Sequence, residues 1–129
     1  MKEIEEILRH YTFENFAKED HKIYPADFFS LDEKILLDVR SREEMEIVKF
    51  PLKDILKVIE IPIYEIPDRF KEIPNRTTVG IFCAASIRAI MVFLYLKAKG
   101  YDNVKILAGG YDLMFPELKP GKLYKSQKL

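Results

Sequence analysis

Three short apolar runs, each followed by residues that favour a helix, most constrain how this chain can fold. They cover residues 35–37, 78–82 and 104–107. Runs this short and this apolar are typical of strands that are buried on both faces of a parallel sheet. Their alternation with helical segments predicts an α/β fold in which helices cover both faces of a mainly parallel sheet.

Residues that start and end helices lie at the expected places between these runs. Ser41 is followed three residues later by Glu44, which is the pattern of a capping box at a helix N-terminus. Pro25 suits the first turn of a short helix, because its missing N–H has no partner to lose there. Residues 88–99 form a longer helical pattern that Gly100 closes.

The chain of 129 residues has the size of one domain, with an extension at each end. We predict an N-terminal helical arm over residues 1–22, a single domain over 23–118 and a basic tail over 119–129. The arm is interpreted as packing on the core, and a docking element is the alternative. The tail contains four lysines and no acidic residue, so we expect a solvated, frayed terminus. The apolar positions of the arm are Ile4, Ile7 and Leu8.

Composition excludes several classes of partner and site. Basic and acidic residues both number 21, so no overall field favours nucleic acid or an anionic membrane. No apolar run is long enough to span a bilayer, and the first ten residues are acidic, which predicts a cytoplasmic protein. The single cysteine, Cys83, cannot form an internal disulfide, and no Cys or His spacing suggests a metal. We therefore expect neither metal nor cofactor, and Cys83 is either core filler or a reactive thiol.

Cys83 ends the second apolar run and opens a six-residue loop that leads into the long helix. Small side chains allow several backbone N–H groups to converge on one point, and the helix adds its positive end. These groups and the Arg88 guanidinium favour an anion such as a thiolate, a persulfide or the oxyanion of a sulfur donor. We interpret Cys83 as the nucleophile and Arg88 as the residue that binds the anion. The predicted substrate-binding loop comprises Ala84, Ala85, Ser86, Ile87 and Arg88.

These residues, with two other segments, resemble the rhodanese family. The segment ILLDVRSREE, residues 35–44, is similar to the family pattern LLDVR-x-x-x-E, and CAASIR, residues 83–88, is similar to C-x-x-G-x-R. Residues 94–111 resemble the closing pattern YL-x-x-x-GY-x-x-V-x-x-L-x-GG-[YF]. The resemblance implies a three-layer rhodanese-like fold with about five strands. It also implies that Cys83 accepts sulfur as a persulfide from a small sulfur donor or a sulfur-carrying protein.

The resemblance also suggests roles for nearby residues and shows three departures. Asp38 matches a family residue that could hydrogen-bond the cysteine loop, although a helix cap or an ion pair with a basic residue is an equal alternative. We expect Arg40 and Glu44, four residues apart, to form a structural pair. Residues 48–53 replace the usual GHIPGA and precede an apparent five-residue insertion. Ser86 stands where the family has glycine and is strained if its φ is positive. Met114 replaces an aromatic residue and should fill the core equally well.

The predicted activity is transfer of sulfane sulfur, from thiosulfate or a persulfide, to a thiophilic acceptor. A cysteine phosphatase of related fold is the nearest rival enzyme, but its loop is C-x5-R. Only four residues separate Cys83 from Arg88, which gives a smaller cradle that suits sulfur. An interaction or regulatory module that has lost turnover is the rival of another class, and the departure at residues 48–53 is its best support.

Overall fold

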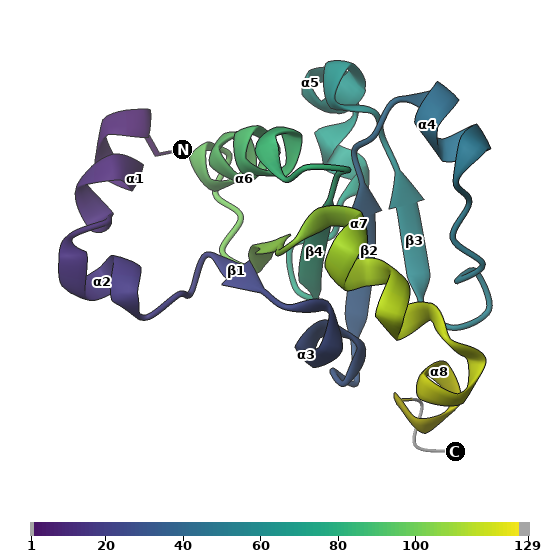
Figure 1. The fold of residues 1–129 in the computed structure, drawn as a ribbon. Helices are drawn as coiled ribbons and strands as arrows, with labels where there is room; N and C mark the ends of the chain where they lie inside the picture. The colour runs from purple at the N-terminus through teal and green to yellow at the C-terminus, as the bar shows by residue number, and fades with distance from the viewer. Residues whose placement is uncertain (1, 127–129) are drawn as a thin grey trace.

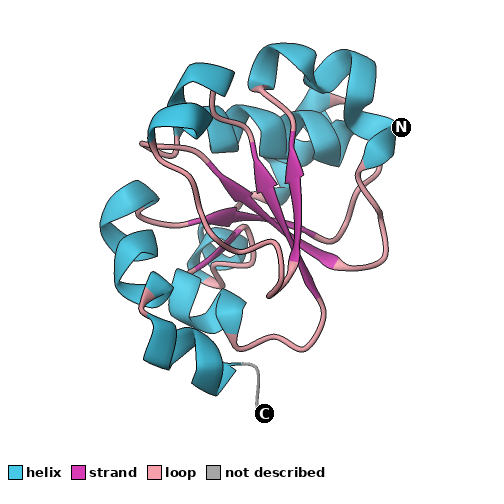
Figure 2. Cartoon of the chain, turned by 90° about the vertical axis from the view of Figure 1, so that its right-hand side faces the viewer, coloured by secondary structure: helices cyan, strands magenta, loops and turns pink. Residues whose placement is uncertain are grey.

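A computed structural model describes residues 2–126 and contains one sheet of five parallel strands. The strands lie in the order β1-β5-β4-β2-β3, so β4 occupies the centre. In Figure 2 the strands are magenta and the helices that surround them are cyan. This confirms the predicted α/β class and the predicted number of strands. The strands are β1 (Lys22–Ile23), β2 (Lys34–Asp38), β3 (Lys57–Glu60), β4 (Thr78–Phe82) and β5 (Val104–Leu107).

Helices connect the strands, because the chain must cross back over the sheet between one parallel strand and the next. These helices cover both faces of the sheet (Figure 1). The α-helices are α1 (Ile4–His10), α2 (Phe13–Ala17), α3 (Pro25–Phe29), α4 (Arg42–Ile47), α5 (Ile66–Arg69), α6 (Ile87–Ala98), α7 (Gly110–Met114) and α8 (Pro120–Ser126). Short 3-10 helices occur at η1 (Ile63–Glu65), η2 (Phe70–Glu72) and η3 (Phe115–Leu118). Among the described residues, no helix is both long and apolar enough to span a bilayer.

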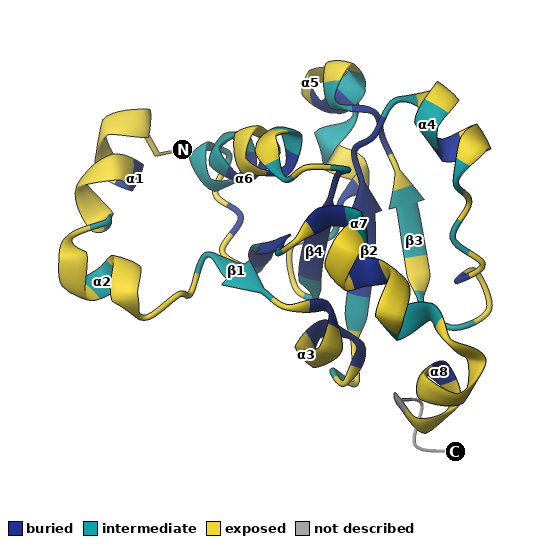
Figure 3. Cartoon of the chain, in the orientation of Figure 1, coloured by how far each residue is buried: buried dark blue, intermediate teal, exposed yellow. Residues whose placement is uncertain are grey.

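Side chains that alternate along each strand divide the core into two parts. In β2, Ile35 and Leu37 point to one face of the sheet and Leu36 points to the other. The first face packs mainly against α6, through Ala89, Val92, Phe93 and Leu96. The second face packs against α3, α7 and α8, through Phe28, Phe29, Met114 and Leu123. Strands β2 and β4 are buried in this core (Figure 3). Packing on both faces therefore fixes the point at which each of these two strands ends.

The predicted helix signals are confirmed. Ser41 caps α4, and its hydroxyl accepts a bond from the Glu44 N–H while the Glu44 carboxylate accepts from the Ser41 N–H. Pro25 is the first residue of α3. Gly100, with a φ of +96°, lies just past the end of α6.

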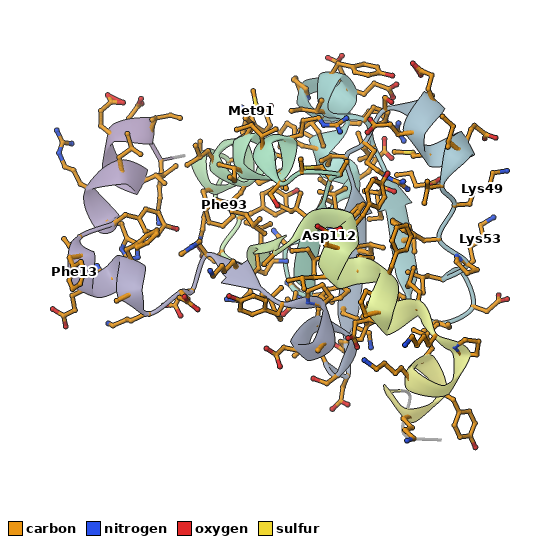
Figure 4. All side chains as sticks on the ribbon, in the orientation of Figure 1. Phe13, Lys49, Lys53, Met91, Phe93 and Asp112 are labelled. Atoms are coloured by element: carbon orange, nitrogen blue, oxygen red, sulfur yellow. The ribbon has the colours of Figure 1, made fainter. Side chains whose placement is uncertain are left out.

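The two ends of the chain are more structured than the sequence suggested. The predicted N-terminal helical arm forms two helices, and only Ile7 of its three apolar positions is buried. Phe13 on α2 is 90% exposed and points away from the rest of the chain (Figure 4). The expectation of a frayed tail was wrong for residues 120–126, which form α8. Leu123 anchors this helix because its side chain is buried in the second part of the core. The last part of the predicted tail, residues 127–129, lies outside the described residues.

Candidate active site

Cys83 lies directly after the central strand β4, at the carboxyl edge of the sheet. Its side chain is 1% exposed, and Sγ accepts a hydrogen bond from the backbone N–H of Ala89 at 3.2 Å. Ala89 is the third residue of α6, so this N–H is one of those that have no partner within the helix. The first turn of α6 therefore offers hydrogen-bonding capacity and a positive end to the sulfur, as the sequence predicted.

Ser86 turns the loop into α6 with a backbone conformation that is unusual for a serine. Its φ is +72° and its ψ is −22°, in the left-handed region, and its side chain makes no capping hydrogen bond. The position therefore requires the positive φ that a glycine adopts without penalty. The strain suspected from the sequence is present, and it lies three residues after Cys83.

Replacing Ser86 with glycine should stabilise the protein. Removing the Cβ at a left-handed position should raise the free energy of unfolding by about 0.5–1 kcal/mol, net of the greater flexibility of glycine when unfolded. Urea denaturation of the wild type and of Ser86→Gly measures this difference. A lower free energy of unfolding in Ser86→Gly would show that the serine is not strained.

Gly110, the first residue of α7, lies against the cysteine loop at Ala84. Its φ is +54°, and a Cβ placed on it would lie 2.1 Å from the carbonyl oxygen of Ala84. The absence of a side chain at Gly110 thus lets α7 approach the backbone of the residue next to Cys83. This contact gives a structural reason for a glycine before Tyr111.

Gly110→Ala should therefore destabilise the protein more than a matched substitution elsewhere. Gly100 also has a positive φ, but nothing lies within 4 Å of a Cβ placed there. We expect Gly100→Ala to cost about 1–2 kcal/mol from backbone strain alone. Gly110→Ala should cost about 1–3 kcal/mol more, because the loop must also move. Equal losses in urea denaturation would mean that the Ala84 contact is unimportant.

Arg88 lies one residue inside α6 and forms an ion pair with Glu44, the residue that also completes the cap of α4. The pair is bidentate, with Nη1 to Oε1 at 2.5 Å and Nη2 to Oε2 at 2.9 Å. Hydrogen bonds from Arg88, opposed by partial burial and helped by bonds from Ser41, lower the pKa of Glu44 to about 2. Glu44 is thus ionised at neutral pH.

The expected side-chain pair of Arg40 with Glu44 was wrong. The capping box turns the Glu44 carboxylate back toward the first turn of α4, where Arg88 reaches it. Arg40 instead reaches only the backbone carbonyl of Glu44, at 3.5 Å. Glu44 is the residue of the candidate site whose contact with the loop was not foreseen. The signal in the sequence is that Glu44 matches the final residue of the LLDVR-x-x-x-E pattern, which a helix cap alone does not require.

Asp38 does not bond the cysteine loop directly but forms the predicted alternative, an ion pair with a basic residue. Its carboxylate accepts from Nε of Arg40 at 2.9 Å and from Nη2 at 2.7 Å, and both side chains are 1% exposed. Burial acts to lower the pKa of Arg40, but bonds to Asp38 and Tyr111 outweigh it and raise the pKa.

Arg40 links this pair to the helix that contacts the loop. Its Nη1 donates to the hydroxyl of Tyr111 at 2.8 Å, and the guanidinium lies 4.5 Å from the ring centre of Phe50. Tyr111 follows Gly110, whose backbone abuts Ala84. The Asp38 side chain is therefore linked to the loop through Arg40 and α7.

The segment over residues 48–53, where the sequence departs from the family pattern, lines a separate groove. The cavity measures about 610 Å³ and is bordered by α4 and β3, and neither Cys83 nor Arg88 lines it. Lys49 and Lys53 extend outward on the same side of the molecule (Figure 4). Met114, the third departure from the family pattern, is fully buried in the second part of the core, as expected.

Two solved structures resemble this fold. A rhodanese-related protein from Thermoplasma volcanium has a TM-score of 0.65 and 24% identity, over 78% of this chain and 95% of that one. An NAD-dependent persulfide reductase from A. fulgidus has a TM-score of 0.56 and 34% identity, over 76% of this chain but only 16% of that one.

Curated relatives share sequence over a similar region. The tRNA sulfurtransferase of Haemophilus ducreyi is 37% identical over 78 residues, which is 60% of this chain and 16% of that protein. The tRNA sulfurtransferase of Aeromonas salmonicida is 30% identical over 93 residues, 72% of this chain and 19% of that protein. The matched region thus spans less than a fifth of the length of either relative. The family profile of the rhodanese-like domain matches residues 27–114, which include the whole loop from Cys83 to Arg88, and the chain belongs to that family.

Proposed function

We propose that this protein is a sulfurtransferase that moves sulfane sulfur from a donor to a thiophilic acceptor through a persulfide on Cys83. The observation that supports it best is the hydrogen bond from the Ala89 N–H to the Cys83 sulfur at the start of α6. An N–H donor at a helix N-terminus favours a negatively charged sulfur over a neutral one. The Cys83 thiolate, which attacks the donor and is released again at the end of the reaction, has this charge on the bonded sulfur.

The proposed reaction has two steps and needs no general base. The Cys83 thiolate attacks the outer sulfur of thiosulfate, a sulfur–sulfur bond forms, and sulfite leaves with the electron pair of the broken bond. A nucleophile such as cyanide then takes the terminal sulfur, forms thiocyanate and releases the thiolate. Neither step removes a proton from water, so no histidine beside Cys83 is required.

The partners proposed for this reaction are a small sulfur donor or a protein that carries sulfur. The relatives are named for tRNA, but the equal numbers of acidic and basic residues support our prediction that this chain itself binds no nucleic acid. A cytoplasmic location is part of the proposal, because a reducing compartment keeps a single cysteine as a thiol.

Thiocyanate formation tests the proposal. The purified protein is supplied with cyanide and, in turn, with thiosulfate, methanethiosulfonate and glutathione persulfide. Turnover with at least one donor is the expected result. Hydrolysis of phosphate esters without sulfur transfer would indicate the phosphatase alternative. If the protein shows neither sulfur transfer nor hydrolysis, the result favours the interaction module.

A further inference from the structure

Arg88 was expected to act as a free cation at the end of the loop, but its guanidinium is already bound. Both terminal nitrogens donate to the Glu44 carboxylate. The Ser41 N–H and hydroxyl bond the same carboxylate at 3.0 and 2.9 Å, so Glu44 is anchored by its own helix as well. The Glu44 carboxylate thus accepts hydrogen bonds both from Arg88 and from Ser41, the cap of its own helix.

This pairing changes the charge beside Cys83. The pKa of Arg88 is raised mainly by its bonds to Glu44, against the effect of burial. Arg88 directly precedes Ala89, whose backbone N–H bonds the Cys83 sulfur, so the ion pair begins at the residue next to this contact. Because Glu44 is ionised, the pair has no net charge, and the second guanidinium at this edge, Arg40, is likewise neutralised by Asp38.

We propose that Glu44 determines the specificity of the sulfur transfer, by neutralising Arg88 so that the site selects donors with one negative charge over donors with two. The favoured class comprises donors whose sulfur-bearing group has a single negative charge, namely thiol persulfides and organic thiosulfonates, and the disfavoured donor is the thiosulfate dianion. The inference rests on the proposed function, which it deepens by naming the donor class. Its physical basis is that the extra charge of a dianion is repelled by the Glu44 carboxylate and gains little from a guanidinium that this carboxylate already compensates.

Two matched donors and one substitution test this inference. Thiosulfate and methanethiosulfonate both deliver one sulfane sulfur, and their leaving groups, sulfite and methanesulfinate, differ by one charge. Glu44→Gln removes the carboxylate charge but retains the capping box, which glutamine also forms. The ratio of kcat/KM for thiosulfate to that for methanethiosulfonate, with cyanide as the acceptor, should rise about tenfold in Glu44→Gln. That change corresponds to about 1.4 kcal/mol.

Control variants separate this effect from a loss of structure or of overall charge. Glu72, at the end of η2, forms a similar bidentate pair with Arg69, at the end of α5, so Glu72→Gln should leave the ratio at the wild-type value. Glu44→Asp keeps the charge and should also keep the ratio low, even if its shorter side chain reduces both rates.

The possible results separate a failure of donor selection by Glu44 from a failure of sulfur transfer itself. If the wild type and Glu44→Gln use both donors with the same ratio, Glu44 does not select by charge, although sulfur transfer stands. If Glu44→Asp shifts the ratio as much as Glu44→Gln, geometry rather than charge is responsible and the inference is wrong. If no donor yields thiocyanate with any variant, the proposed function fails and the inference falls with it.

Discussion

Cys83→Ser should reduce sulfur transfer by at least about 10³-fold with every donor, because a serine hydroxyl is not ionised at neutral pH and its oxygen cannot form a persulfide. The chain has no second cysteine to take over the role. Rates of thiocyanate formation with the wild type and with Cys83→Ser, at equal protein concentration, measure the loss.

The serine variant should remain folded, which makes the loss interpretable. A serine oxygen at position 83 can still accept the Ala89 N–H that now bonds the sulfur, so no buried donor is left unpaired. Its circular dichroism spectrum and denaturation midpoint provide the control. Turnover equal to the wild type in a folded Cys83→Ser would remove Cys83 from the reaction.

Arg40→Met should cost about 3–5 kcal/mol of the free energy of unfolding, because it leaves the Asp38 carboxylate buried without its ion-pair partner. A small domain has only about 5–15 kcal/mol in total, so this loss is a large share of the whole. Urea denaturation followed by circular dichroism measures the change.

A neighbouring arginine and a double variant provide the comparison. Arg42 is also paired, with Glu65, but its side chain is 55% exposed, so Arg42→Met should cost less than about 1 kcal/mol. Asp38→Asn combined with Arg40→Met should be less destabilising than Arg40→Met alone, since the unpaired charge is gone. If Arg40→Met were as mild as Arg42→Met, the buried pair would not be a support of the loop.

The sequence was most informative where a short segment determines its own structure. The strands over β2, β4 and β5, the capping box at Ser41 and the loop after β4 all follow from local patterns of apolar and capping residues. The positive φ at Ser86 could be suspected for the same reason, since a family glycine marks a backbone need.

Contacts between distant segments were not predictable in this way. Glu44 was assigned to Arg40 because helical spacing allows that pair, whereas its actual partner is 44 residues away on another helix. The tail was expected to fray because its charge is all basic, but burial of Leu123 against the sheet outweighs that composition. The close approach of Gly110 to Ala84 likewise depends on how two loops meet in the fold.

Intact-protein mass spectrometry after incubation with a sulfane donor tests the central claim most directly. The account predicts that the native protein gains one sulfur atom, that cyanide removes it, and that Cys83→Ser never acquires it. The added sulfur should also be lost faster in denaturant, where the start of α6 and its Ala89 N–H are no longer held beside Cys83. If the native protein gains no sulfur from thiosulfate, methanethiosulfonate or glutathione persulfide while its thiol can still be alkylated, Cys83 is not a sulfur carrier.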